Sequence, residues 1–207
     1  MDIDQFWRLI EQSARETERK QARFEWLRDR LAQRRPEEIV DFKELLSATE
    51  KKAYTWLMWG ALLGLFGYGG DDGFRYFRLW LVGLGRDAFE RVAREPDALV
   101  ELPAIRHLLG KQSAWLRRPD HLDGSAWSND EWPDFEWLEF VPDAAWEQAT
   151  GEDADGLYAA YRARGHDPSC VPQPGGEEWD VYDWDETARR LPRVGRYLRD
   201  PHRGIDD

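Results

Sequence analysis

Hydrophobic residues recur every three or four positions along most of the chain, the spacing of one face of an α-helix. The first helix is expected to begin at Asp2 or Asp4, where a carboxylate can cap free amides and Gln5 can complete a capping box with Asp2. An amphipathic helix around Phe24 follows, and Arg34–Pro36 end it because the residue before proline avoids the helical region. The chain therefore begins with two amphipathic helices.

The next predicted helix is unusually long. Pro36 suits a first helical position, and helical spacing of apolar residues continues from Ile39 to Ala61, for about seven turns. The run Ala53–Phe66 is apolar on nearly every side, so we expect it to be the central helix of the core. It is shorter than the roughly 20 residues that cross a bilayer, so no membrane span is expected.

Glycines punctuate the middle of the chain. The segment Gly67–Gly73 is predicted to interrupt the helical pattern, which resumes at Phe74–Leu84 and again at Asp87–Arg94. A further helix, Ala104–Leu109, is expected to end at Gly110 in a left-handed cap. Residues 1–110 are therefore predicted to form a helical core.

Beyond residue 110 the pattern becomes irregular. Residues 111–134 are predicted to be a long polar loop or insertion, and Phe135–Val141 fits a helix or a strand. A helix is then predicted to start or kink at Pro142 and to end at Gly151, followed by a helix over Leu157–Arg164. An irregular arm carries Trp179, Tyr182 and Trp184. It leads into a short predicted helix over Asp185–Leu191 and a frayed basic end. Residues 135–207 are expected to pack on the core. The fold class predicted is mainly α, one multi-helix domain with a long irregular acidic-aromatic C-terminal region.

Charge and composition narrow the classes of partner. The chain has 207 residues and a formal net charge of −12, and residues 120–207 alone carry 22 acidic and 8 basic side chains. Such a surface repels phosphate backbones, so nucleic acid is disfavoured as a partner and a basic protein is favoured. One cysteine fits a reducing compartment, and the first residues lack the pattern of a secretory signal, so we expect a cytoplasmic protein.

Several stretches carry a family resemblance. They are Met1–Trp7, Pro36–Phe42, Trp59–Ala61, Asp71–Leu81, Gly85 and Pro96-Asp97. Over roughly residues 1–165 the chain resembles the domain-of-unknown-function family 4240, a family of small bacterial proteins. Two segments depart from the family: Gly64–Gly70 differs from the sequence usual there, and residues 111–134 look like an insertion. The resemblance implies a mostly helical domain. It implies no activity, so it assigns no catalytic residue.

The loop Gly67–Phe74 and the helix that follows form the first candidate site. Its candidate ligand-binding residues are Trp59, Asp71, Asp72, Arg75, Arg78 and Trp80. The two acids could hold a ligand or a metal ion, or one could act as a general base while arginine orients an acidic substrate. The same residues also fit a structural interpretation, in which one aspartate caps the helix and Phe74 anchors the core. The stretch lacks the marks of a phosphate loop and of an EF-hand.

The two arginines of this stretch also have two interpretations. Arg75 and Arg78 lie three positions apart and share a helix face. Pairing with Asp71 or Asp72 would hold the loop in place, whereas exposed arginines would bind an anion or a carboxylate.

An acidic-aromatic stretch over Trp127–Trp146 is the second candidate. Its candidate partner-surface residues are Trp127, Trp132, Trp137, Glu136 and Glu139. Aromatic anchors among acids suit a basic protein partner. The alternative is that the rings cover the helical core while the acids stay in water.

Other chemistry is not indicated by the sequence. Cys170 lies four residues after His166, but nothing supplies the orienting third group of a nucleophilic pair. The histidines 107, 121, 166 and 202 lack metal-ligand spacing, and no cofactor motif is present. We therefore expect a non-catalytic cytoplasmic binding or regulatory protein, for example an acidic inhibitor of a basic protein. The alternative is an enzyme or small-ligand binder with its site at Gly67–Arg78.

Overall fold

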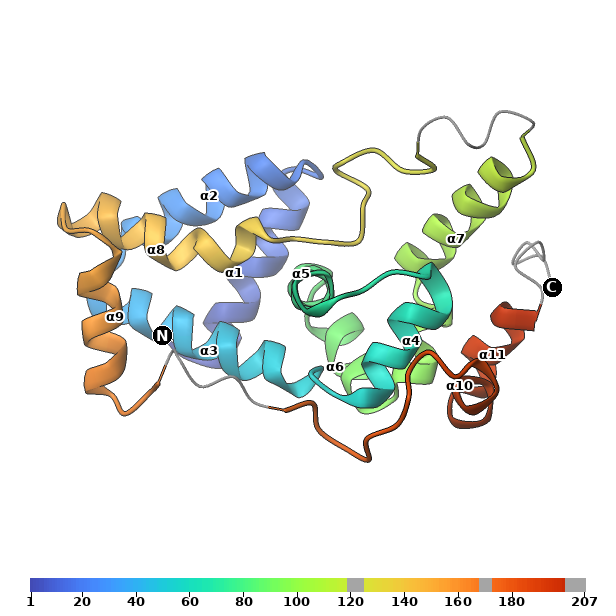
Figure 1. The fold of residues 1–207 in the computed structure, drawn as a ribbon. Coiled ribbons are helices and arrows are strands. Elements are labelled where there is room, and N and C mark those ends of the chain that lie inside the picture. The colour runs from blue at the N-terminus through green and yellow to red at the C-terminus, as the bar shows by residue number, and fades with distance from the viewer. Residues whose placement is uncertain (119–124, 168–172, 200–207) are drawn as a thin grey trace. The chain divides into compact units, whose positions relative to one another are not determined.

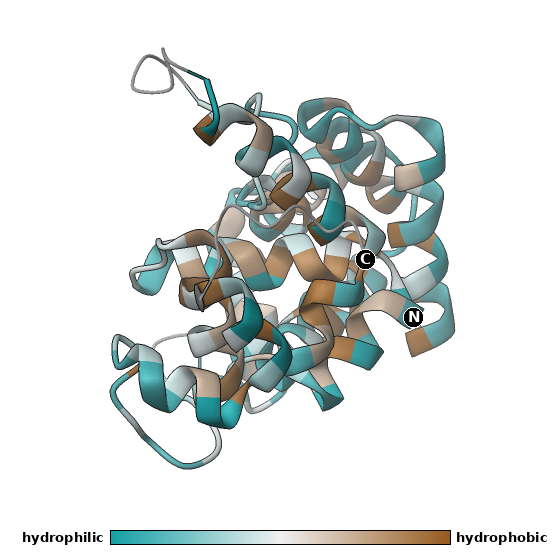
Figure 2. Cartoon of the chain, turned by 90° about the vertical axis from the view of Figure 1, so that its right-hand side faces the viewer, coloured by the Kyte–Doolittle hydropathy of each residue, from teal (hydrophilic) through white to brown (hydrophobic). Residues whose placement is uncertain are grey.

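The computed structural model describes residues 1–118, 125–167 and 173–199, and in these ranges the chain forms eleven α-helices, one 3-10 helix and no β-strand (Figure 1). Hydrophobic and hydrophilic segments alternate along the helices in Figure 2, as amphipathic helices require. The mainly α fold class is therefore confirmed. No helix in the described ranges is long and apolar enough to cross a bilayer. The chain divides into two compact units, each assembled from separate stretches of sequence.

The first unit comprises residues 1–52, 76–86 and 134–173. Its helices are α1 (Ile3–Glu16), α2 (Lys20–Ala32), α3 (Pro36–Lys52), α8 (Trp137–Thr150), α9 (Ala154–Ala163) and the part of α5 (Asp71–Gly83) from Tyr76 onward. Helix α8 packs against α2, α3 and α9, and α1 packs against α2 and α3. Aromatic rings fill part of the core, where the ring centroids of Phe6 and Phe42 are 5.1 Å apart and both side chains are fully buried.

Two helix termini of this unit follow the sequence closely. The Asp2 carboxylate accepts a hydrogen bond from the Gln5 amide at 2.7 Å, and the Gln5 side chain accepts one from the Asp2 amide at 2.9 Å. This is the predicted capping box, and it satisfies two of the free amides at the start of α1. Helix α3 begins at Pro36, as predicted. Proline suits this position because the N–H groups of the first helical residues have no partner within the helix, so its missing N–H costs no hydrogen bond.

The ambiguous stretch before Pro142 is helical. Helix α8 runs from Trp137 through Pro142, which lies inside the helix and is buried together with Leu138 and Val141. The proline costs one backbone hydrogen bond in a helix whose apolar face is already buried, so the helix continues. Helix α8 ends at Gly151, as predicted, and this glycine adopts the left-handed conformation at φ 73°.

The second unit comprises residues 53–75, 87–133 and 174–207. Its helices are α4 (Trp56–Phe66), the beginning of α5, α6 (Arg86–Arg94, from Asp87 onward), η1 (Pro96–Glu101), α7 (Pro103–Leu116), α10 (Trp184–Arg190) and α11 (Pro192–Arg199). Helix α4 packs against η1, α10 and α11. Seven of its eleven residues are buried, so this helix is the core element that its apolar composition predicted.

Glycines on α4 let two other segments approach its backbone. A Cβ atom added at Gly60 would lie 2.4 Å from the Trp179 ring, and one added at Gly64 would lie 2.7 Å from Val194. Gly60 and Gly64 are one helical turn apart, so together they leave a notch on one face of α4. Trp179 of the C-terminal arm and Val194 of α11 fill this notch.

The prediction of one long helix from Pro36 to Ala61 is wrong, because the helix is interrupted between α3 and α4. Thr55 caps α4 by accepting a hydrogen bond from the Met58 amide at 3.1 Å. The backbone on either side of Thr55 pairs with Gly175, whose amide donates to Tyr54 O at 2.8 Å and whose carbonyl accepts from Trp56 N at 3.1 Å. These bonds to a distant segment replace the helical bonds that the periodicity predicted.

Three further boundaries differ from the sequence prediction. Helix α7 passes through Gly110 and ends at Leu116, so the predicted left-handed cap is absent there and the predicted loop begins later than residue 111. Helix α5 begins at Asp71, inside the segment predicted to be a break. Residues 192–199, predicted to be frayed, form α11, because Val194 is fully buried.

Candidate functional site

Trp59 holds the glycine loop between α4 and α5 in place. Its indole Nε1 donates a 2.7 Å hydrogen bond to the carbonyl of Gly69, and its ring stacks on Phe74 with 5.0 Å between centroids. Phe74 is buried, as the structural interpretation predicted. Gly67 ends α4 at a φ of 72°, a left-handed conformation that favours glycine. Trp59 therefore has a structural task in this loop.

Asp71 and Asp72 are exposed and lie in the first turn of α5. The helix begins at Asp71 itself, and the first backbone bond runs from Phe74 N to Gly70 O at 2.8 Å. In the described chain neither carboxylate accepts a backbone amide, so neither is the predicted cap. Their negative charge at a helix N-terminus is still favourable. Arg75, one turn later, is also exposed.

Arg78 has a partner that the sequence analysis did not name. This residue is buried, and its guanidinium forms a 2.8 Å ion pair with Glu50 of α3. Trp80 is half-buried and stacks on Phe77 at 5.7 Å. The candidates divide between the two units, since Trp59, Asp71, Asp72 and Arg75 belong to the second and Arg78 and Trp80 to the first.

Two of the proposed partner-surface tryptophans cover the core instead. Trp127 is only 8% exposed, and its Nε1 donates to the Leu108 carbonyl at 2.9 Å. Trp132 packs edge-on against it, with 4.9 Å between ring centroids. Here the alternative interpretation, in which rings cover apolar surface, describes the structure.

The neighbouring acid Glu131 is held by several donors. Lys111 donates to it at 2.5 Å, and the Ser128 amide and hydroxyl donate at 3.0 and 2.8 Å. The hydrogen bond from Lys111, followed by those from Ser128, lowers the pKa of Glu131 to about 2. The carboxylate is therefore charged at neutral pH and serves to tie residues 128–131 to α7.

Trp137 is the candidate that remains on the surface. It is 45% exposed at the start of α8, where its ring packs edge-on against Phe24 of α2. Phe140, one turn later, is exposed to a similar degree. Glu136 and Glu139 beside them are partly buried. This surface therefore holds two exposed rings and two acids with limited access to solvent.

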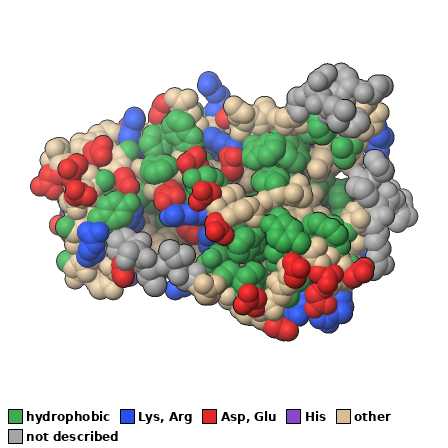
Figure 3. Space-filling model, in the orientation of Figure 1, with side chains coloured by type: hydrophobic (Ala, Val, Ile, Leu, Met, Phe, Trp, Pro, Cys, Tyr) green, Lys and Arg blue, Asp and Glu red, His purple; other side chains and the backbone are tan. Residues whose placement is uncertain are grey.

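A denser acidic-aromatic surface lies in the second unit, on the arm that leads into α10. Tyr182 is 62% exposed and Trp184 is 45% exposed. Six acids share this short stretch: Glu177, Glu178, Asp180, Asp183, Asp185 and Glu186. Figure 3 shows acidic side chains beside hydrophobic ones in the region of α10. We call residues 177–186 the acidic arm. Its aromatic residues were noticed in the sequence but not assigned to a site.

Buried neighbours anchor the acidic arm. Trp179 and Val181 are buried and pack with Leu63 of α4, so the arm alternates between buried and exposed side chains up to Tyr182. This alternation was the signal in the sequence that could have separated Trp179 from Tyr182. The rings of Tyr182 and Trp184 are consequently presented on a fixed backbone.

Hydrogen bonds and ion pairs further fix the acidic arm. Asp183 caps α10 by accepting from the amides of Asp185 and Glu186 at 3.1 and 3.0 Å. Arg190 pairs with Glu186 at 2.6 Å and with Glu177 at 3.0 Å. Hydrogen bonds from Arg189 and Arg190 lower the pKa of Glu186 to about 2. Glu178 and Asp185 have no cationic partner within the described ranges, so their charges remain available to another molecule.

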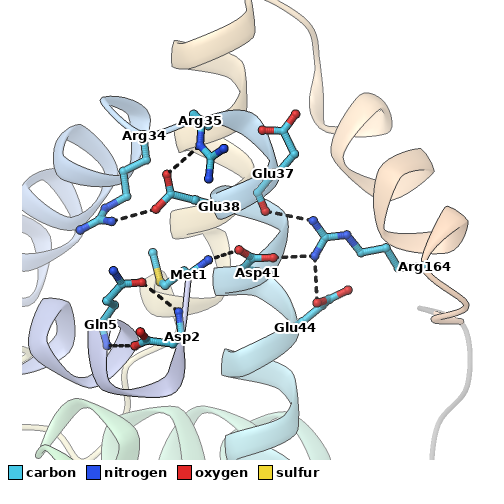
Figure 4. A network of polar contacts seen from close by, with 10 residues as sticks. All are labelled: Met1, Asp2, Gln5, Arg34, Arg35, Glu37, Glu38, Asp41, Glu44 and Arg164. Carbon is cyan, nitrogen blue, oxygen red and sulfur yellow. Dashed lines mark hydrogen bonds and ion pairs between the residues drawn. The ribbon is translucent and has the colours of Figure 1, made fainter.

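A polar network joins α3, α9 and the first residue (Figure 4). Arg164 donates to Asp41 at 2.7 Å, to Glu44 at 3.0 Å and to the Glu37 carbonyl at 3.1 Å, and the amino group of Met1 also donates to Asp41. Burial raises the pKa of Asp41, but the hydrogen bonds from these two cations outweigh it, and the net pKa lies below its ordinary value. These charges satisfy one another, so the network has a structural role.

Some sequence predictions fall outside the described residues. Cys170, His121 and His202 are among them, so the Cys170–His166 pair is not described. His166 itself is exposed and lies 2.9 Å from Glu44. In the described part of the chain, no group of three or more histidine, cysteine, aspartate or glutamate side chains is arranged to hold a metal ion.

The fold and these surfaces define a mainly α-helical protein with an exposed acidic-aromatic arm. A sequence profile described as "Protein of unknown function (DUF4240)" matches residues 1–148, and the chain belongs to this family. This finding confirms the resemblance seen in the sequence. No curated protein and no solved structure gives a significant match to the chain. The acidic arm lies beyond the residues that the family profile matches.

Proposed function

We propose that this protein is a non-catalytic binding protein of the cytoplasm that holds a basic protein partner on its acidic arm. The observation that carries the proposal is the exposure of Tyr182 and Trp184, 62% and 45% respectively, on the same arm as the two unpaired carboxylates of Glu178 and Asp185. Large aromatic side chains are the residues that most often supply binding energy at protein interfaces. An acidic inhibitor of a basic protein is the concrete form of this function.

Charge and rigidity both support this assignment. The carboxylates of Glu178 and Asp185 would attract a basic partner over a distance of about 10 Å at moderate salt. The cap formed by Asp183 and the ion pairs of Arg190 hold the backbone before a partner arrives. A surface that is already ordered loses less conformational entropy when it binds, which favours affinity.

The alternative of an enzyme or small-ligand binder at Gly67–Arg78 has less support. Trp59 is occupied with Gly69 and Phe74, and Arg78 is occupied with Glu50. These contacts explain both side chains without a ligand. No specific observation at this loop therefore favours the second function.

The test uses the full chain, immobilised and exposed to a native cytoplasmic lysate at low and at high salt. We expect a basic protein, identified by mass spectrometry, to be retained at low salt and released by added salt. The variant Tyr182→Ser/Trp184→Ser should weaken the purified complex by about 2 kcal/mol or more, about thirtyfold in Kd.

The matched control is Trp137→Ser/Phe140→Ser, which removes two exposed rings, 45% and 46% exposed, from α8 in the first unit. This variant should keep the affinity of the wild-type chain. Retention that resists high salt, or a complex that the control variant weakens as strongly as the acidic-arm variant, would overturn the proposal.

A further inference from the structure

A groove in the first unit is lined by basic residues, although the chain as a whole is acidic. The groove has a volume of about 630 Å³ and lies between the end of α1 and the second half of α2. Its lining residues are Gln12, Arg15, Glu16, Trp26, Arg30, Gln33 and Arg34. Three arginines against one glutamate give the groove a positive charge. Its volume falls in the range of about 300–1,000 Å³ found for small-molecule sites.

Two of the arginines are available to a ligand. Within the described ranges Arg15 and Arg30 form no ion pair with a carboxylate, and both are exposed. Arg34 uses one nitrogen, Nη1, for Glu38 at 3.0 Å (Figure 4), and a guanidinium has five N–H donors in all. Each of the three arginines therefore retains donors that can face a phosphate or carboxylate group. Arginine binds such groups through two parallel hydrogen bonds.

Trp26 adds a flat apolar surface to this charged groove. The guanidinium carbon of Arg30 lies 5.4 Å from the centroid of the Trp26 ring, a cation–π contact. The contact restrains Arg30, so less entropy is lost when the arginine pairs with an anion. Aromatic rings and guanidinium planes also stack on the bases of nucleotides. The side-chain amides of Gln12 and Gln33 supply both donors and acceptors for the edge of a base.

We infer that this groove binds a nucleoside polyphosphate, with the phosphates on Arg15, Arg30 and Arg34 and the base against Trp26. The ligand class follows from the lining, because the three arginines suit phosphate groups and the Trp26 ring suits a base. A long nucleic acid is disfavoured, since the net charge of −12 repels an extended polyanion while three arginines can neutralise a short one.

The first test is calorimetric titration of the full chain with ADP, inorganic pyrophosphate and adenosine. ADP is expected to bind, pyrophosphate to bind at least tenfold more weakly and adenosine to show no measurable binding. No binding of ADP, or adenosine binding as tightly as ADP, would overturn the inference. A short single-stranded oligonucleotide that binds more tightly than ADP would overturn it as well.

The second test compares matched variants. Arg15→Gln/Arg30→Gln should weaken ADP binding at least tenfold, whereas Arg8→Gln/Arg19→Gln removes the same charge from exposed positions outside the groove and should change it less than twofold. Arg15 and Arg30 also lie in the last turns of their helices, where a cation stabilises the helix dipole. If that were their whole role, the first variant would lower the melting temperature but leave ADP binding unchanged, and the inference would fail.

A third variant keeps the inference testable if loss of two arginines disturbs the fold. Trp26→Leu should abolish the preference for ADP over pyrophosphate, because it removes the surface assigned to the base, while loss of the Trp26–Arg30 contact weakens both ligands alike. Circular dichroism of each variant establishes that the helical content is that of the wild-type chain. An unchanged preference for ADP in this variant would contradict the place assigned to the base.

Discussion

At the scale of single residues, the absence of a side chain at Gly60 decides how the second unit packs. The Trp179 ring lies only 2.4 Å from the position that a Cβ atom would take at Gly60, and Trp179 belongs to the acidic arm. Glycine weakens an isolated helix by roughly 0.5–1 kcal/mol relative to alanine. Here the space that it leaves admits a large aromatic ring, whose burial opposes this cost.

We therefore predict opposite effects for two glycine-to-alanine substitutions in helices. Gly60→Ala should lower the free energy of unfolding by about 1–3 kcal/mol, because the added methyl group would lie 2.4 Å from a buried ring. Gly110→Ala in α7, where the added group meets nothing within 4 Å, should raise it by about 0.5–1 kcal/mol. Urea denaturation followed by circular dichroism measures both. Equal effects of the two substitutions would show that Trp179 does not occupy the notch.

At the scale of helices, the starts differ in how they are stabilised. Helix α10 is short, and Asp183 satisfies two of its free amides. Helix α5 begins with Asp71 and Asp72, whose carboxylates accept no backbone amide in the described chain and act only through the helix dipole. A hydrogen-bonded cap is worth about 1 kcal/mol, whereas an exposed charge near the dipole contributes about 0.3–1 kcal/mol.

This difference gives a second prediction. Asp183→Ala should lower the free energy of unfolding by about 1 kcal/mol and reduce protection of the first amides of α10 from hydrogen exchange. Asp72→Ala should change the free energy by less than about 0.5 kcal/mol. Thermal denaturation and hydrogen-exchange mass spectrometry measure the two effects. A loss of about 1 kcal/mol in Asp72→Ala would mean that this carboxylate caps α5 after all.

Helix boundaries that depend on neighbouring residues could be predicted from the sequence, whereas those that depend on distant segments could not. The capping box of Asp2 and Gln5 and the proline at the start of α3 depend only on residues within one helical turn, so both helix starts could be predicted. The break before α4 could not, because Gly175 supplies the bonds that replace the helix there. The partner of Trp127, the carbonyl of Leu108, is also distant in the sequence. Composition alone therefore could not distinguish the buried Trp127 from the exposed Tyr182.

At the scale of the whole molecule, two acidic residues far apart in the sequence are held in the charged form by hydrogen bonds from neighbouring side chains. Glu131 and Glu186 both have a pKa of about 2, lowered by hydrogen bonds from Lys111 and Ser128 in one case and from Arg189 and Arg190 in the other. Because these values lie below the ordinary value of 4.5, the folded chain binds fewer protons than the unfolded chain between the two values. Their contribution to stability is therefore complete above pH 4.5 and is lost as the pH falls toward 2.

The third prediction follows from that sign. The melting temperature should fall between pH 4.5 and 2, and Glu131→Gln should make this fall shallower because one of the titrating groups is gone. The matched control is Glu147→Gln, which removes an exposed carboxylate from α8 and should keep the wild-type pH dependence. Differential scanning calorimetry between pH 4.5 and 2 measures the melting temperature of each variant. Identical slopes for Glu131→Gln and the wild-type chain would contradict the lowered pKa.

The notch on α4 also has a consequence for any protein that carries only the matched stretch of this family. The profile ends at residue 148, yet Trp179, Leu191 and Val194, all buried, come after it and line the face of α4 that carries Gly60 and Gly64. In a shorter relative without such residues, that face of α4 would be exposed to solvent. An exposed apolar surface of this kind favours association between copies of a chain. Relatives of that length must then either pair through this helix or cover it with side chains of a different segment.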